Sequence, residues 1–148
     1  MPAPTEMKGG TAVSTSMLDD VRILLVDDEP EMLDLLDEFL QDCGAKVTVV
    51  HSARAAVAAI VADPPDVLIS DIGMPGEDGY WLIRAVRALP CDEGGAVAAI
   101  AMTGDVVTNS PGAVFQAGFD ELRAKPFDLD DLAKLVARLA AADARCRT

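Results

Sequence analysis

The stretch Val67-Leu68-Ile69-Ser70-Asp71-Ile72-Gly73-Met74-Pro75-Gly76 decides the fold and contains the first candidate for chemistry. A short apolar run leads directly into Asp71, and a turn rich in glycine and proline ends the run. Strands that helices cover on both faces have this nearly continuous apolar pattern. A carboxylate at the carboxyl end of such a strand lies where open α/β sheets place their active sites. We therefore take Asp71 as the candidate reacting residue.

The composition limits the kinds of partner that this chain binds. The chain has 148 residues, of which 51% are hydrophobic, and this predicts one globular domain with a full core. It carries 25 acidic and only 12 basic residues, for a net charge of −13. Binding to nucleic acids and anionic membranes is driven by lysine and arginine. The sequence therefore predicts no direct contact with nucleic acid and no contact with a membrane.

The two ends of the chain are predicted to lie outside the domain. Residues 1–20 are rich in Pro, Gly, Ser and Thr and are expected to form a flexible leader. The domain is predicted over residues 21–142, and residues 143–148 form a short tail. The leader has no signal-peptide core, and no apolar run approaches about 20 residues. The three cysteines form no C-x-x-C pair, which favours reduced thiols and a cytoplasmic location.

Apolar runs and helical patterns alternate five times along the domain. Helix starts are marked by Pro30 and Pro111 in first turns and by Ser52 and Asp128 as N-caps. Parallel strands need such crossover helices, so the alternation predicts an α/β fold arranged as a three-layer sandwich. The predicted strands cover residues 21–26, 46–50, 66–70, 97–102 and 121–124. The predicted helices cover residues 30–43, 52–62, 80–89, 110–118 and 128–142.

Polar residues follow four of the five predicted strands, and a parallel sheet brings all of these ends to one edge. Oxygen ligands without histidine or cysteine favour a hard ion such as Mg²⁺. A lysine adds a positive point charge for a phosphoryl oxygen, and a threonine adds a neutral donor. Gly104 leaves room for the phosphoryl group. Together they predict a phosphoryl-transfer site. The converging residues are Asp27, Asp28, Asp71, Thr103 and Lys125.

Four motifs in this order and spacing resemble response-regulator receiver domains, the CheY-like phosphoacceptor domains of two-component signalling. The resemblance covers roughly Asp20 to Ala142. It implies a flavodoxin-like receiver fold, with a five-stranded parallel sheet in the order 2-1-3-4-5 and five helices. The motifs are Val26-Asp27-Asp28-Glu29-Pro30, Asp71-Ile72-Gly73-Met74-Pro75 with Asp78-Gly79, Ala101-Met102-Thr103-Gly104, and Lys125-Pro126-Phe127.

The resemblance implies a role for each acidic residue of these motifs. Asp71 matches the phosphoacceptor, which receives a phosphoryl group from a histidine of a sensor kinase or of a histidine phosphotransfer protein. Asp28 and Asp71 match direct Mg²⁺ ligands, and Asp27 matches a ligand that acts mainly through water. The backbone carbonyl of Gly73 is the further expected ligand. Mn²⁺ is expected to substitute for Mg²⁺.

The resemblance also implies how the phosphoryl group is sensed. Lys125 is expected to pair with the phosphoryl group and Thr103 to move toward it. The Lys125-Pro126 peptide bond is expected to be cis. Gly104, Asp105 and Pro126 flank the site. The signal is then expected to reach a downstream protein through the face formed by the fourth helix, fifth strand and fifth helix.

The chain departs from the receiver pattern at Leu122. Receivers usually carry Tyr, Phe or His three residues before the lysine, whereas leucine has no ring to swing and no hydrogen-bonding group. The usual coupling of threonine to an aromatic side chain is therefore not expected in its ordinary form. Gly73 and Asp105 stand two residues beyond Asp71 and Thr103. We expect them to tune the phosphoryl lifetime through water access, with Gly73 leaving the path open and Asp105 positioning a water.

The sequence thus predicts a phospho-receiver switch that catalyses only its own phosphorylation and dephosphorylation. It would be a stand-alone regulator or a receiver from a hybrid kinase. One alternative is a Mg²⁺-dependent phosphohydrolase with an aspartyl nucleophile, but phosphatases of the haloacid-dehalogenase type carry a second aspartate where this chain has Gly73. The other alternative is a receiver-like scaffold that is never phosphorylated, for which Leu122 argues weakly.

Overall fold

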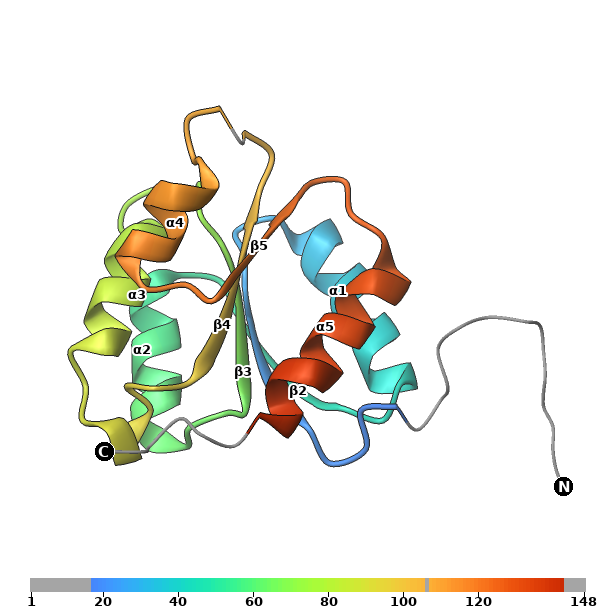
Figure 1. Cartoon of the computed structure of the whole chain (residues 1–148). Coiled ribbons are helices and arrows are strands. Elements are labelled where there is room, and N and C mark those ends of the chain that lie inside the picture. The colour runs from blue at the N-terminus through green and yellow to red at the C-terminus, as the bar shows by residue number, and fades with distance from the viewer. Residues whose placement is uncertain (1–16, 106, 143–148) are drawn as a thin grey trace, which may run out of the picture.

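The computed structural model describes residues 17–105 and 107–142, and they form five consecutive βα units (Figure 1). The five strands form one parallel sheet in the order β2-β1-β3-β4-β5. The predicted three-layer sandwich and its strand order are confirmed. The strands are β1 (Arg22–Val26), β2 (Lys46–Val50), β3 (Val67–Asp71), β4 (Ala98–Thr103) and β5 (Glu121–Ala124). The helices are α1 (Pro30–Asp42), α2 (Ala53–Ala62), α3 (Gly79–Arg87), α4 (Pro111–Ala117) and α5 (Leu129–Ala141), with a 3-10 turn η2 (Cys91–Glu93) before β4.

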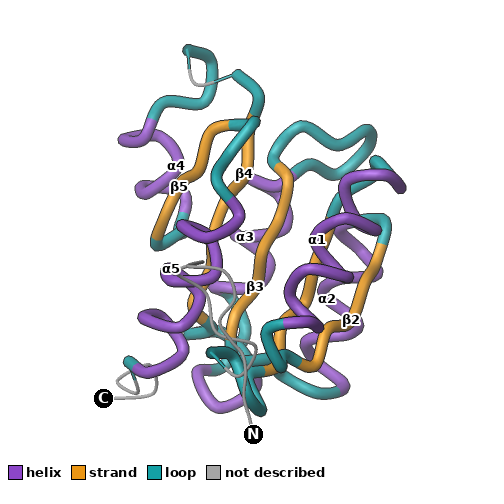
Figure 2. The backbone as a smooth tube through the Cα atoms, turned by 90° about the vertical axis from the view of Figure 1, so that its right-hand side faces the viewer, coloured by secondary structure: helices purple, strands orange, loops and turns teal. Residues whose placement is uncertain are grey.

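The helices cover the two faces of the sheet unequally. Helices α1 and α5 lie on one face, and Figure 2 shows them in front of the strands, while α2, α3 and α4 lie on the other. Successive strand residues point to opposite faces, so Leu25 and Ile69 pack toward α1 and α5, whereas Leu24 and Leu68 pack toward α2 and α3. Every residue of β3 is buried. The strand that carries Asp71 is therefore, like β4, enclosed along its whole length.

Helices α1, α2, α4 and α5 begin at, or directly after, the residues that the sequence marked as first-turn prolines or N-caps. Pro30 lies in the first turn of α1. The Ser52 hydroxyl accepts a hydrogen bond from the Ala55 amide at 3.2 Å, and the Asp128 carboxylate accepts one from the Asp130 amide at 2.9 Å. These caps satisfy amides that the first turn of a helix leaves without partners.

The packed domain extends beyond the N-terminal boundary expected from the sequence. Leu18 falls within the expected leader, but its side chain is fully buried in the core. Its amide donates a hydrogen bond of 2.8 Å to the Cys43 carbonyl. Packing of the domain thus includes Leu18. Residues 1–16 of the expected leader, and the expected tail over residues 143–148, lie outside the described residues.

Two further sequence expectations concern the cysteines and the membrane. Cys43 is a buried free thiol, and burial raises its pKa. Cys91 is disulfide-bonded, so the expectation of reduced thiols does not hold for this residue. Sequence separation, on which that expectation depended, does not limit which thiols meet in a fold. Among the described residues, none of the helices has the length and apolarity required to span a membrane.

Candidate functional site

Asp71 is the last residue of β3, at the carboxyl edge of the sheet. Its carbonyl oxygen accepts a hydrogen bond from the Ser70 hydroxyl at 2.9 Å, and the next amide, that of Ile72, donates to the Met102 carbonyl of β4 at 3.0 Å. The backbone on both sides of Asp71 is therefore held in place, and only 6% of the residue is exposed. The point from which the Asp71 side chain leaves the backbone is therefore fixed at the edge of the sheet.

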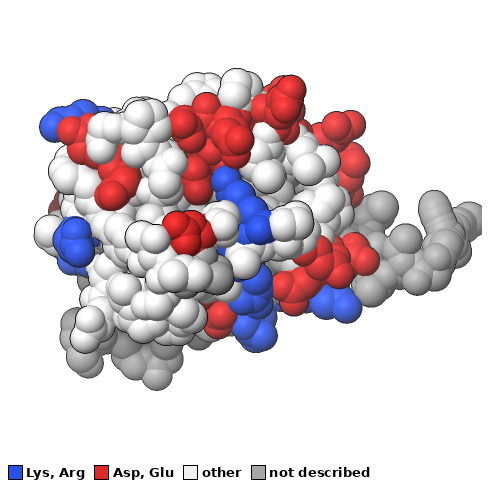
Figure 3. Space-filling view, turned by 90° about the horizontal axis from the view of Figure 1, so that it is seen from above, with Lys and Arg blue, Asp and Glu red and all other residues white. Residues whose placement is uncertain are grey.

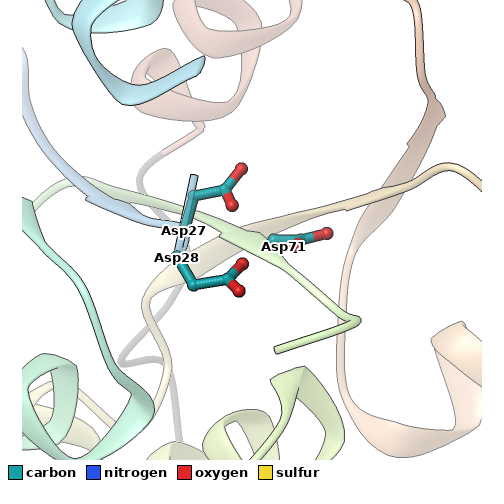
Figure 4. A group of neighbouring side chains, drawn as sticks. All are labelled: Asp27, Asp28 and Asp71. Atoms are coloured by element: carbon teal, nitrogen blue, oxygen red, sulfur yellow. The ribbon is translucent and has the colours of Figure 1, made fainter. Parts of the chain in front are cut away.

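Asp27 and Asp28 follow β1 directly and lie beside Asp71. Each of the three carboxylates offers an oxygen within 4.8 Å of the other two, and they point toward the same space (Figure 4). Asp27 is fully buried, whereas Asp28 is exposed. Burial raises the pKa of Asp27, as does the charge of Asp71, and the Glu29 amide and Lys125 oppose this rise. The predicted convergence of these three acids is present in the structure.

Lys125, which follows β5, supplies positive charge to this cluster. Its Nζ atom lies 3.3 Å from an oxygen of Asp27, 3.3 Å from one of Asp71 and 3.4 Å from one of Glu29. Burial alone would lower the pKa of Lys125, but the charges of Asp71 and Asp27 outweigh it, so the pKa is raised. Lys125 therefore remains protonated and holds acids from two strands together.

Thr103 ends β4 and lies almost completely buried beside the same cleft. Its hydroxyl donates to the Asp105 carbonyl at 3.3 Å and accepts from the Asp105 amide at 3.0 Å. The Asp105 carboxylate accepts hydrogen bonds from the amides of Val107 and Thr108, and the Thr108 amide is the main cause of its lowered pKa. Asp105 thus stabilises its own loop, and the water-positioning role expected for it stays a prediction.

The predicted residues surround a cleft of about 530 Å³. Figure 3 looks down on this edge of the sheet, where acidic side chains gather beside a narrow basic strip. A Cβ atom on Gly73 or Gly104 would meet no other atom within 4 Å, so both glycines leave open space. Open space was predicted beside both glycines, for a phosphoryl group at Gly104 and for water access at Gly73, and these uses stay predictions. The lining residues are Asp28, Glu29, Asp71, Gly73, Thr103, Gly104, Asp105, Asn109 and Lys125.

Two of these lining residues were given no role from the sequence. Glu29 stands inside the acidic motif, and its position directly after Asp28 at the end of a strand was the available signal. Asn109 lies six residues after Thr103 in the loop before α4, where no spacing rule marks it. Its side chain amide donates to the Thr103 hydroxyl at 3.1 Å. Only the folded loop brings Asn109 to the site.

Two features near Lys125 were singled out from the sequence, the bond to Pro126 and the side chain of Leu122. The Lys125-Pro126 peptide bond is cis, as expected. Leu122, three residues before Lys125, is partly buried and packs against the core cluster that includes α3 and α4. It therefore contributes only apolar contacts where receivers usually place an aromatic ring.

The donor set fits a hard divalent cation. Three carboxylates offer oxygens within 4.8 Å of one another, and one of them, Asp27, is buried with a raised pKa. Such crowding repels, and a cation relieves the repulsion. All the available ligand atoms are oxygens, which Mg²⁺ prefers to the nitrogen and sulfur ligands of softer metals.

Comparisons with known proteins agree with this geometry. The family profile described as "Response regulator receiver domain" matches residues 23–137. An uncharacterized 14.6 kDa protein of Leptolyngbya boryana is 40% identical over 114 residues, which are 77% of this chain and 86% of that protein. The sensor histidine kinase GacS of Pseudomonas protegens is 36% identical over 116 residues, 78% of this chain but only 13% of the kinase.

A solved structure shows the same fold with a metal bound. The receiver domain of the sensor histidine kinase PA1611 from Pseudomonas aeruginosa PAO1 has a magnesium ion coordinated in its active-site cleft. It aligns with a TM-score of 0.75 at 30% identity, covering 82% of this chain and 98% of that domain. From its motifs, its sheet order and these matches, we conclude that the chain belongs to the response regulator receiver domain family of two-component signalling.

Proposed function

We propose that Asp71 accepts a phosphoryl group from a phosphohistidine of a sensor kinase or of a histidine phosphotransfer protein. The observation that carries the proposal is the meeting of Asp27, Asp28 and Asp71, with oxygens within 4.8 Å, beside Lys125. The occurrence of similar sequence in a sensor histidine kinase and in the response regulator Rre1 supports this class of donor. The domain would work either alone or within a larger protein.

The acidic cluster is proposed to hold Mg²⁺. Asp28, Asp71 and the Gly73 carbonyl would be direct ligands, and the buried Asp27 would act mainly through water. Bound Mg²⁺ would neutralise the crowded carboxylates and the phosphoryl oxygens. Mn²⁺ would substitute because it accepts the same oxygen ligands. The magnesium in the cleft of the PA1611 receiver domain supports this assignment.

The residues of this chain then perform the transfer. A carboxylate oxygen of Asp71 forms a bond to phosphorus as the phosphorus–nitrogen bond of the donor breaks, and the imidazole nitrogen keeps the electron pair. The Nζ atom of Lys125 lies 3.3 Å from a carboxylate oxygen of Asp71 and would then pair with a negatively charged phosphoryl oxygen. The Thr103 hydroxyl turns to donate to another phosphoryl oxygen. Gly73 and Gly104 leave the space that the group needs.

The output is proposed to be contact with a downstream protein. The face formed by α4, β5 and α5 would carry it, and α4 carries Phe115, an apolar side chain that is about half exposed. The net charge of −13 argues against nucleic acid as the direct target. We propose a cytoplasmic location, where kinases meet ATP. In this proposal the domain catalyses only its own phosphorylation and dephosphorylation.

One experiment separates this function from its rivals. The protein is incubated with Mg²⁺ and acetyl phosphate, and its intact mass is measured. We expect one phosphate adduct that disappears in Asp71→Asn, disappears with a chelator, and persists in Asp92→Asn, which removes an exposed acid at the opposite edge. Sustained hydrolysis of many phosphoesters would instead indicate the phosphohydrolase. Absence of any adduct would indicate a scaffold and would refute the proposal.

A further inference from the structure

A chain of two side-chain hydrogen bonds connects Thr103 to helix α3. The Asn109 side chain donates through Nδ2 to the Thr103 hydroxyl at 3.1 Å. Its Oδ1 atom accepts a hydrogen bond of 2.9 Å from the Tyr80 hydroxyl. Tyr80 lies in the first turn of α3, so two side chains connect the end of β4 to a helix of a different βα unit.

Leu122 offers Thr103 no comparable connection. Leu122 has no hydrogen-bonding group in its side chain, which packs against the hydrophobic core cluster. Apolar contacts do not depend on which way a hydroxyl hydrogen points. Among the described side chains, that of Asn109 hydrogen-bonds to the Thr103 hydroxyl, so a change at this hydroxyl reaches Asn109 and then Tyr80.

The hydroxyl of Thr103 has one hydrogen to donate, and the Asp105 carbonyl now receives it at 3.3 Å. Its oxygen accepts from the Asp105 amide and from Asn109. Donation to a phosphoryl group on Asp71 requires the hydroxyl to leave the Asp105 carbonyl. That movement changes the distance to Asn109 and so disturbs the bond between Asn109 and Tyr80.

Tyr80 lines the groove between α3 and α4, so a change in its hydrogen bond to Asn109 affects this groove. The groove has a volume of about 1140 Å³ and is lined by Tyr80, Trp81, Arg84 and Gln116, among others. The Arg84 guanidinium lies over the Tyr80 ring at 5.7 Å from its centre. A shift of the ring therefore moves a cation in the groove wall, next to the single tryptophan of the chain.

We propose that Asn109 and Tyr80 are positioning residues that act through Thr103 and carry the phosphorylation state of Asp71 to the α3–α4 groove, in place of an aromatic side chain at position 122. The inference rests on the proposed phosphorylation of Asp71. It differs from the ordinary receiver output, because the signal reaches α3 and the α3-facing side of α4.

The test uses Trp81 as its reporter. The emission of the full chain is recorded in Mg²⁺ before and after acetyl phosphate, and the adduct is quantified by intact mass in the same samples. We expect an emission change in the wild type and in Leu122→Val. We expect the change per adduct to fall at least five-fold in Tyr80→Phe, which removes one oxygen, and in Asn109→Ala. Asp71→Asn in the same donor gives the baseline.

The outcomes separate the two proposals. No adduct in the wild type overturns the proposed function and the relay with it. An adduct without any emission change overturns the relay alone, as does an emission change that Tyr80→Phe and Asn109→Ala retain in full. Loss of the change in Leu122→Val, with normal adduct, would place the relay on Leu122 and also overturn it. The midpoint of urea unfolding of each variant shows that it is folded.

Discussion

Lys125 and Arg87 are both largely buried cations, but they stand at opposite edges of the sheet and are held in opposite ways. Lys125, at the carboxyl edge, contacts three carboxylates at 3.3–3.4 Å. Arg87, at the amino edge, donates to the carbonyls of Gly118, Gly95 and Val97 at 2.7–2.9 Å and pairs with Asp120 at 3.2 Å. Burial lowers the pKa of Arg87, and Asp120 opposes this effect.

This difference distinguishes the two edges of the sheet: at the amino edge the cation stabilises the fold, and at the carboxyl edge the cation belongs to the candidate site. The guanidinium of Arg87 is planar and directs its donors at acceptors that are fixed in the backbone, so exchanging partners would break the fold. The ammonium of Lys125 is a point charge on a flexible stem, and side-chain carboxylates, not backbone carbonyls, surround it. The glycines follow the same division. A Cβ on Gly95 at the amino edge would collide with the Leu89 carbonyl, whereas a Cβ on Gly73 would meet nothing within 4 Å.

The largest effect is expected from replacing the two cations by methionine, which keeps an apolar stem. Arg87→Met leaves three carbonyls without this donor and Asp120 with only the Ala99 amide, and we expect it to lower the unfolding free energy by about 3–5 kcal/mol. Lys125→Met in saturating Mg²⁺ should lower it by less than about 1 kcal/mol, because the metal compensates the same carboxylates. Urea unfolding measures both. Equal losses in the two variants would contradict the division between the edges.

Removal of the metal should weaken the carboxyl edge alone. A ligand at 100 times its dissociation constant stabilises the folded state by about 2.7 kcal/mol. We expect Mg²⁺ at that level to raise the unfolding free energy of the wild type by this amount and that of Asp28→Asn by very little. Thermal or urea unfolding with Mg²⁺ and with a chelator provides the measurement.

The matched control for this metal effect is Asp92→Asn, an exposed acid at the amino edge. It should keep the full stabilisation by Mg²⁺. If Asp28→Asn gained as much stability from Mg²⁺ as Asp92→Asn, the ion would bind away from the acidic cluster.

A pair of glycine substitutions tests the same contrast without any change of charge. Gly95→Ala forces a methyl group against the Leu89 and Pro90 carbonyls, and we expect a loss of about 2 kcal/mol. Gly73→Ala places its methyl group in open space, and the stability should stay within about 0.5 kcal/mol of the wild type. Urea midpoints compare the two. A loss in Gly73→Ala as large as in Gly95→Ala would show that the cleft is packed and not open.

The smallest expected effect is the ionisation of Tyr80 beside the functional edge. Burial raises the pKa of Tyr80, as does Asp78, whereas Arg84 lowers it. The folded state thus holds this proton more tightly than the unfolded state, whose tyrosine pKa is about 10. Stability should therefore fall as the pH rises through about 10.

Tyr80 is the single tyrosine of the chain, so an absorbance titration of tyrosinate reports on it alone. We expect the native chain to titrate at higher pH than the chain in urea. In Arg84→Met the native titration should move to still higher pH, because a nearby positive charge is removed. Coincident native and unfolded curves would show that the ring is not buried.

Much of the site was predictable because its chemistry is encoded at the ends of strands. An apolar run that ends in Asp71, or in Asp27 and Asp28, is a local pattern, and parallel strands must bring such ends to one edge. The same rule predicted that Lys125 and Thr103 lie beside Asp71, although they are far from it in the chain. The N-terminal boundary was less predictable, because Leu18 follows a polar stretch and only its contacts with the core show that it belongs to the domain.

The sequence by itself determined the class of fold, the acidic cluster and the lysine beside it, because periodicity and strand-end position are properties of neighbouring residues. The tertiary structure decided the rest. Glu29 forms an ion pair with Lys125, and Asn109 hydrogen-bonds to both Thr103 and Tyr80. Arg87 donates to three carbonyls that belong to two other segments of the chain. These contacts depend on loop paths and side-chain directions, and such geometry is set by packing between segments that are distant in the chain.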